Sequence, residues 1–143
     1  MSDVTREVFP LIWSSDVAAV SDWAVESLGL IQSWRADDED GVAEHVELHW
    51  HWQGKACGKV SINISRDTYE GMGPSGISLR VDDVAAVDEI HAKAVAAGAS
   101  ITQGPEKSVI AYSFTAVDPD GNQWWVNAET GMLDQLRASG PTD

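Results

Sequence analysis

Hydrophobic and polar positions follow a pattern that occurs twice along this chain. The five residues Asp-Val-Ala-Ala-Val stand at Asp16–Val20 and again at Asp83–Val87. Each copy follows a strand-like apolar run, Val8–Trp13 in the first case and Ile77–Val81 in the second. The repeat of one strand-plus-helix unit indicates a duplicated module.

Each copy also begins a segment with helical periodicity. Asp16 and Asp83 stand where a helix needs an N-cap, because a carboxylate there accepts hydrogen bonds from the free N–H groups of the first turn. The apolar residues that follow recur at helical spacing, and the segments stop at Gly29 and Gly98. Glycine adopts the left-handed conformation that closes many helices. The sequence therefore predicts one helix in each half.

Three further strand-like runs follow each predicted helix. They are Leu30–Ala36, Val42–Trp52 and Lys59–Ser65 in the first half, and Ser100–Gln103, Val109–Val117 and Gln123–Asn127 in the second. Each half thus has the order β-α-β-β-β, and the fold class is α+β. The prediction is one domain over residues 1–143, with module one at about 7–66, module two at about 75–129 and a C-terminal tail at 130–143. The joint is Arg66–Ser75, and one helical turn is expected around Met132–Arg137.

The composition, with 43% hydrophobic residues, is that of a globular protein. No apolar run approaches the ~18–20 residues that a membrane span needs. The N-terminus has neither the basic start nor the apolar stretch of a signal peptide. The single cysteine, Cys57, excludes an intramolecular disulfide and fits a reducing compartment. We therefore expect a cytoplasmic protein.

The formal net charge of −14 narrows the class of partner. Nine Lys and Arg residues against 23 acids cannot supply a face that neutralises phosphates, which excludes nucleic acid. The same charge disfavours anionic membranes. A cationic ligand would instead be attracted by the long-range field, in a manner that salt weakens.

A second motif, Asp-Pro-Asp-Gly-Asn at Asp118–Asn122, is typical of a tight turn between two strands. Together with the two βαβββ modules it makes the chain resemble the vicinal oxygen chelate superfamily. That superfamily includes glyoxalase I, extradiol dioxygenases, and fosfomycin and bleomycin resistance proteins. The resemblance covers about residues 7–129 and implies a curved mixed sheet, or half-barrel, with the helices on its outer face. It also implies a homodimer, because members usually close their open sheet edges by pairing modules.

The resemblance also says where metal-dependent members place their ligands, on the first and last strand of each module. Counted from the two capping aspartates and from Asp118, these positions fall on Phe9, Gly76 and Trp125. On the last strand of module one they fall on the polar set Ser61, Asn63 and Ser65. Phenylalanine, glycine and tryptophan offer no side-chain donor to a divalent metal. The sequence therefore predicts that no metal or other cofactor is bound.

Aromatic side chains replace those ligands in the expected groove. Period-two alternation turns Phe9, Leu11 and Trp13 toward it, with Trp125 on the last strand, whereas Trp23 and Trp34 are expected to pack in the core. Arg80 is a candidate cation within the groove, and it pairs either with a ligand carboxylate or with a neighbouring acid such as Asp82 or Asp118. The complete predicted ligand-binding set is Phe9, Leu11, Trp13, Asn63, Arg80, Tyr112 and Trp125.

A cluster of metal-ligating residue types, His45, Glu47, His49 and His51, alternates along one predicted strand. Residues two apart on a strand lie roughly 6.5–7 Å from each other, so two of these imidazoles can converge on one zinc or nickel ion. A strand with one solvent-facing polar side gives the same pattern.

Three functions fit these observations. The first is a binding protein without catalysis, which holds an aromatic or cationic small molecule in an aromatic-lined groove as bleomycin resistance proteins do. The alternative is a metal-dependent lyase, isomerase or dioxygenase of the same superfamily with a rearranged His/Glu site. The third is a small interaction domain whose cavity is filled by its own side chains.

Overall fold

The computed structural model of the chain describes residues 7–65, 74–130 and 138. The helical turn predicted around Met132–Arg137 lies outside the described residues, as do residues 66–73 of the predicted joint. Within the described part of the chain, no helix is long and apolar enough to cross a membrane.

The described chain forms the two predicted modules. The first consists of β1 (Leu11–Ser14), α1 (Val17–Leu28), β2 (Ile31–Asp37), β3 (Ala43–Trp52) and β4 (Lys55–Ile64). The second consists of β5 (Gly76–Arg80), α2 (Val84–Ala96), β6 (Ser100–Lys107), β7 (Ala111–Val117) and β8 (Gln123–Glu129). The α+β architecture with tandem βαβββ modules is confirmed. The first strand is shorter than predicted, because it begins at Leu11 rather than at Val8.

The repeated Asp-Val-Ala-Ala-Val sequence begins both helices in the same way. The Asp16 carboxylate accepts a hydrogen bond from the Ala19 N–H at 3.1 Å, and Asp83 accepts one from Ala86 at 2.9 Å. Each bond satisfies one N–H group of a first helical turn that has no partner within the helix. Gly29 then ends α1 in the left-handed conformation, with φ of 80°.

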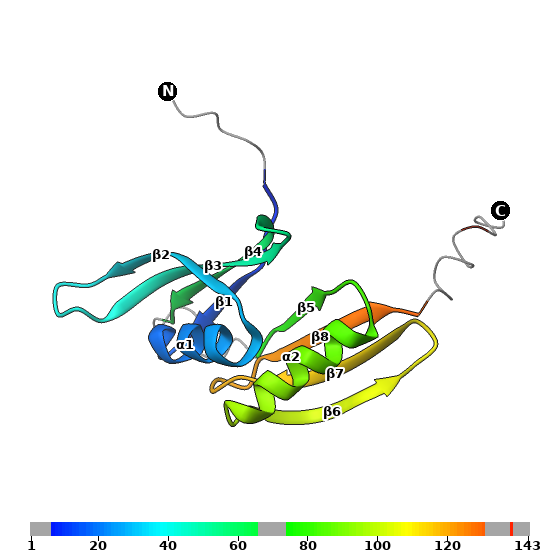
Figure 1. Cartoon of the computed structure of the whole chain (residues 1–143). Helices are drawn as coiled ribbons and strands as arrows, with labels where there is room; N and C mark the ends of the chain where they lie inside the picture. Colours follow the sequence, from blue (N-terminus) through cyan, green and yellow to red (C-terminus); the bar gives the residue numbers. More distant parts are fainter. Residues whose placement is uncertain (1–6, 66–73, 131–137, 139–143) are drawn as a thin grey trace, which may run out of the picture.

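The strands form two four-stranded mixed sheets within the chain rather than a single one (Figure 1). Their orders are β1-β4-β3-β2 and β5-β8-β7-β6. The first strand of each module pairs in parallel with the last, and the other neighbours are antiparallel. The first strand of each module, β1 or β5, therefore forms one edge of its own sheet.

The two modules pack through their helices. Helix α1 covers one face of the first sheet, α2 covers one face of the second, and the helices contact each other (Figure 1). Trp23 of α1 lies against Trp124 of β8, with ring centroids 5.8 Å apart. Buried residues of both modules form one hydrophobic cluster. The helix-covered faces thus meet in a common core, and the other face of each sheet, named the open face below, points outward.

Asp118 anchors Trp124 in this core. Its Oδ2 accepts hydrogen bonds from the Trp124 Nε1–H and from the Asn122 side-chain amide, both at 2.9 Å. Its Oδ1 accepts from the backbone N–H groups of Asp120 and Asn122. The next acid in the turn, Asp120, accepts a hydrogen bond from the Ser14 hydroxyl of the first module. The predicted turn at Asp118–Asn122 is confirmed, and it also joins the modules.

The carboxylate of Asp118 generates a prediction about stability. Asp118→Ala should lower the free energy of unfolding by about 2–4 kcal/mol, because the buried Trp124 N–H and Asn122 amide lose their acceptor. Urea unfolding followed by circular dichroism measures this loss. Asp38→Ala is a matched control, since Asp38 caps the exposed β2–β3 turn by accepting from the N–H groups of Asp40 and Val42. Equal losses in the two variants would contradict the special role of Asp118.

Candidate functional site

The open face of the first sheet brings together the ligand-binding residues predicted on β1 and β4. The strand register sets Trp13 beside Asn63, and Leu11 beside Ser61. Residues paired across neighbouring strands lie on the same face. Leu11 is 43% exposed, so this face is accessible in the single chain. The predicted grouping of Leu11, Trp13 and Asn63 therefore matches the observed positions.

Trp34 extends this face, contrary to the expectation that it packs in the core. It pairs with Glu47 in the register of β2 and β3, and its side chain is 52% exposed. A β-bulge between Gln32 and Trp34 shifts the alternation of β2. Because the bulge adds a residue, the simple period of two places Trp34 on the wrong face. Its ring meets that of His45 edge-on, at a centroid distance of 4.9 Å.

Phe9 lies immediately before β1 and already holds a cation. The Lys59 Nζ lies 4.2 Å from the centroid of the Phe9 ring. The same ammonium pairs with Glu7 at 2.7 Å and with Glu47 at 3.7 Å. The hydrogen bond to Glu7 is the main cause that raises the pKa of Lys59 above its ordinary value. A cavity of about 270 Å³ adjoins this group of side chains, with His49 also in its lining.

Three residues of the alternative metal site, His45, Glu47 and His49, share this open face without converging. The fourth, His51, follows a β-bulge and borders the cavity between the modules. The His45 Nδ1 hydrogen-bonds the Oδ1 of Asn63, and Glu47 is turned to Lys59. The rings of His49 and His51 lie 6.0 Å apart. Among the described residues, no group of three or more His, Cys, Asp or Glu side chains could hold a metal ion. The spacing along β3 therefore has no third ligand in the described part of the chain.

The open face of the second sheet carries Arg80 and Trp125. The Arg80 guanidinium pairs with Glu129, and its Nε donates to the Oδ1 of Asn127 at 2.6 Å. Arg80 was expected to pair either with a ligand carboxylate or with a neighbouring acid such as Asp82 or Asp118. In the single chain it pairs with a neighbouring acid, and that acid is Glu129. Trp125 lies beside Ser78 in the sheet register and is half-buried.

Tyr112 lies apart from the other predicted ligand-binding residues. The register pairs it with Ala128 on the helix-covered face, and its hydroxyl donates to Asp88 Oδ1 on α2 at 2.6 Å. That hydrogen bond is the main cause that raises the pKa of Tyr112. The structure therefore places Tyr112 between sheet and helix, where alternation with the buried Phe114 would have located it.

Phe9 and Trp125 are not brought together within one chain. Phe9 belongs to the first module and Trp125 to the open face of the second. Because both open faces point away from the common core, a groove that contains the two rings requires a second copy of the chain.

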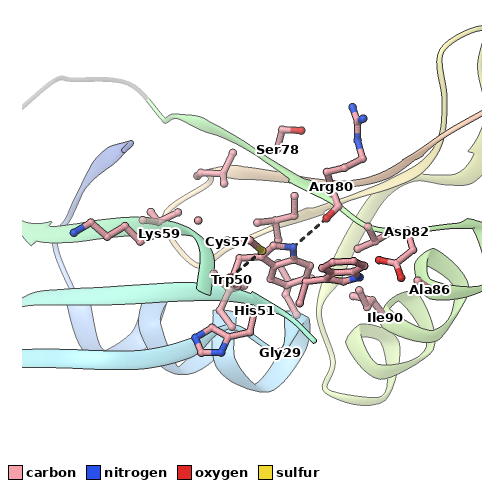
Figure 2. A pocket seen from close by; sticks show the side chains of 18 of the residues that line it. Gly29, Trp50, His51, Cys57, Lys59, Ser78, Arg80, Asp82, Ala86 and Ile90 are labelled. Carbon is pink, nitrogen blue, oxygen red and sulfur yellow. Dashed lines mark hydrogen bonds between the residues drawn. The ribbon is translucent and has the colours of Figure 1, made fainter. Parts of the chain in front are cut away.

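A larger cavity than the one beside Phe9 lies elsewhere, between the modules on their helix-covered side (Figure 2). This inter-module cleft has a volume of about 1010 Å³ and lies between the β3–β4 hairpin, β5 and α2. Trp50 spans it, because its Nε1–H donates to the backbone oxygen of Arg80 at 3.0 Å. Trp52 and Cys57 also belong to its lining.

Sequence reasoning missed the cleft. The alternation of β3 does place Trp50 on the face opposite to the histidines, with the buried Val46 and Leu48. The alternation of β3 carries no information about the second module, which lies opposite that face. A partial signal is available at Trp52, since tryptophan is rarely buried completely and this one stands at a strand end next to Gln53 and Gly54.

Comparisons with known proteins agree with this geometry. A model of the Glyoxalase/Bleomycin resistance protein/Dioxygenase superfamily matches residues 8–126. No curated protein matches the sequence. Among solved structures, TioX from Micromonospora sp. ML1 is similar, with 21% identity, coverage of 86% of this chain and 99% of TioX, and a TM-score of 0.68.

Two further structures show that proteins of different activity share this fold. Lactoylglutathione lyase from Agrobacterium tumefaciens is 17% identical over 92% of this chain and 98% of its own, with a TM-score of 0.66. TnmS3, an antibiotic binding protein from Streptomyces sp. CB03234, is 22% identical over 90% and 100%, with a TM-score of 0.60. At these identities the similarity establishes the fold alone. The family match over residues 8–126, together with the paired βαβββ modules, shows that this chain belongs to the Glyoxalase/Bleomycin resistance protein/Dioxygenase superfamily.

Proposed function

We propose that this protein binds an aromatic or cationic small molecule without catalysis, in the manner of an antibiotic-sequestering protein. The observation that carries the proposal is the open face of the first sheet. Its apolar side chains remain accessible, with Trp34 at 52% exposure, Ile31 at 46% and Leu11 at 43%. Leu11 lies on β1 and the other two on β2, so these side chains flank the open face at its two edge strands. A large exposed apolar side chain at the rim of a face offers contact area to a ligand or a partner. The similarity to TnmS3, whose description is that of an antibiotic binding protein, supports the same class of function.

Charge supports a cationic ligand. The net charge of −14 attracts cations over long range. The Lys59 ammonium above Phe9 supports the idea that this ring and its neighbouring carboxylates accept a positive group. A ligand amine that replaced Lys59 there would keep both the ring contact and the contact with Glu7. The single cysteine in the sequence favours the reducing cytoplasm as the place where this binding occurs.

The proposed ligand groove is completed by a second copy of the chain. The strands β1 and β5 form sheet edges, and an unpaired edge is a template for another strand. A two-fold homodimer would set the first module of one copy beside the second module of its partner. Phe9, Leu11, Trp13 and Asn63 of one copy would then face Trp125 and Arg80 of the other.

Binding is tested by titration with proflavine, a planar aromatic cation, while tryptophan fluorescence is recorded. We expect quenching that weakens as salt rises, because the Debye length falls from about 10 Å at 0.1 M to about 3 Å at 1 M. Trp125→Ala should raise the dissociation constant roughly 2- to 30-fold, which corresponds to the ~0.5–2 kcal/mol of one cation–π contact.

Gln123→Ala is the matched control for Trp125→Ala, since both residues lie on β8 with the same orientation. It should leave the dissociation constant unchanged. The anion 9-anthracenecarboxylate should bind more weakly than proflavine. Tighter binding of the anion, or no effect of Trp125→Ala, would count against the proposed groove.

The dimer is tested by sedimentation velocity at micromolar concentration. We expect a particle of twice the 15.4 kDa chain mass. Trp34→Glu should shift the protein toward the monomer, because it puts a charge on the open face that the partner covers. Val95→Glu on α2 replaces an equally exposed apolar residue, 53% against 52%, and should have no effect. A monomeric wild type would reject the two-chain groove.

Metal content separates this proposal from the alternative, a metal-dependent lyase, isomerase or dioxygenase with a site at His45, Glu47, His49 and His51. We expect the purified protein to lack a stoichiometric divalent metal and to keep its melting temperature in EDTA. Phe9, Gly76 and Trp125 at the expected ligand positions are the reason. Elemental analysis that found one zinc, nickel or iron per chain, removed by EDTA together with stability, would favour the alternative.

A further inference from the structure

The inter-module cleft has the shape and lining of a small-molecule site, and it lies within one chain. Its floor consists of apolar residues that are at most 5% exposed: Leu28, Leu30, Val60, Ile77 and Leu79. Its volume of about 1010 Å³ is at the upper end of ligand pockets, which span roughly 300–1,000 Å³. None of the residues proposed for the open-face groove except Arg80 borders it, and Arg80 does so through its backbone.

Trp50 is fixed as one wall of the cleft. Its indole N–H donates to the Arg80 carbonyl of β5, a strand that pairs only with β8 among the described strands. The Arg80 side chain points to the opposite side, away from Trp50 (Figure 2). The hydrogen bond therefore satisfies the polar atom of Trp50 at the edge of β5 and leaves its aromatic surface to the cavity. Trp52, 51% exposed, belongs to the same lining.

The cleft carries more unpaired negative than unpaired positive charge. A Cβ added at Gly29 would lie 3.3 Å from the Lys93 Nζ, so this ammonium covers the C-terminus of α1, where the helix dipole favours a cation. Lys59 pairs with Glu7. On the α2 side, Asp82 and Glu89 make no ion pair with any other described residue. Lys93 likewise makes no ion pair with a described residue, so two carboxylates stand against one ammonium and the net unpaired charge of the cleft is negative.

We infer that the inter-module cleft is a second binding site, which takes a planar aromatic compound carrying a protonated amine. The aromatic part would lie against Trp50 and Trp52 above the apolar floor, and the amine would be directed to Asp82 and Glu89. The ring contacts and the carboxylates select the same class of molecule. This site needs no second copy of the chain, which distinguishes it from the open-face groove.

The chain contains its own reporter for this site. Cys57 is the single cysteine of the sequence, it is exposed, and it borders the cleft. Alkylation of the full-length protein by neutral iodoacetamide, followed by intact mass, measures its accessibility. With proflavine at ten times its dissociation constant for the cleft, alkylation of Cys57 should slow about tenfold, because the fraction of protein with an empty cleft falls as 1/(1 + [L]/Kd).

Gly58→Leu should abolish this protection, because its side chain would occupy the part of the cleft next to Trp50. Gly58 also borders the smaller cavity beside Phe9, so proflavine quenching is recorded with the same variant and should persist. Gly58 pairs with Trp50 in the strand register, so its side chain points to the same face, and no atom lies within 4 Å of an added Cβ. Gly76→Leu is the matched control, because an added Cβ there also meets no atom within 4 Å but lies on the open face of β5. It should keep the tenfold protection. Asp82→Asn should weaken the binding of proflavine but leave the binding of the neutral 9-anthracenemethanol unchanged.

The two proposed sites fail in different ways. If proflavine quenches fluorescence in a Trp125-dependent manner but never protects Cys57, the cleft is not a binding site and the open-face groove stands. If Cys57 is protected in both the wild type and Trp125→Ala, and Gly58→Leu removes the protection, the inference about the cleft is supported. Protection that survives in Gly58→Leu or disappears in Trp125→Ala would overturn it.

Discussion

The contact between Trp23 and Trp124, held by Asp118, is the constraint on which the rest of this structure depends. Trp124 is fully buried, and a buried indole N–H without an acceptor is costly. Asp118 supplies that acceptor while it also closes the turn before β8. The ring of Trp124 is thereby held where α1 of the other module packs on it. This contact turns the helix-covered faces of both sheets inward.

Two kinds of surface follow from that arrangement. The open faces point outward, with polar and aromatic side chains that one chain leaves accessible. The helix-covered faces pack against α1 and α2, and the inter-module cleft remains between the β3–β4 hairpin, β5 and α2. The fold thus offers one groove that a second copy would complete and one cavity that a single chain already contains.

Three polar side chains of the open faces are occupied by neighbours from the same chain. Arg80 is paired with Glu129, Lys59 with Glu7 and Glu47, and His45 with Asn63. A general acid or base needs a proton that a bound substrate can reach. Groups whose polar atoms are taken up by local partners serve better as fixed walls of a binding surface. This arrangement is consistent with recognition of a ligand by shape, aromatic contact and net charge.

The local structure of this chain can be predicted from its residues alone. The Asp caps, the glycine that ends α1, the period-two strands and the turn at Asp118–Asn122 each depend on residues a few positions apart, and all are present in the structure. Alternation also assigned Leu11 and Trp13 to one face, and the family resemblance added Asn63 on the last strand of the same module. The expectation that Trp34 packs in the core was wrong, because a bulge shifts the alternation of β2. Tyr112 was grouped with the open-face residues, although its alternation with Phe114 indicates the helix-covered face.

Which faces of the two modules meet is visible only in the folded chain. The contact of Trp23 with Trp124 and the hydrogen bonds from Ser14 to Asp120 and from Trp50 to Arg80 each join residues of different modules. No local period encodes such a contact, because it depends on how two complete modules pack. The cleft, the pairing of Arg80 with Glu129, and the separation of Phe9 from Trp125 all follow from that packing or from strand pairings distant in sequence. The sequence could therefore identify the modules and their surfaces, while the position of any site between them required the fold.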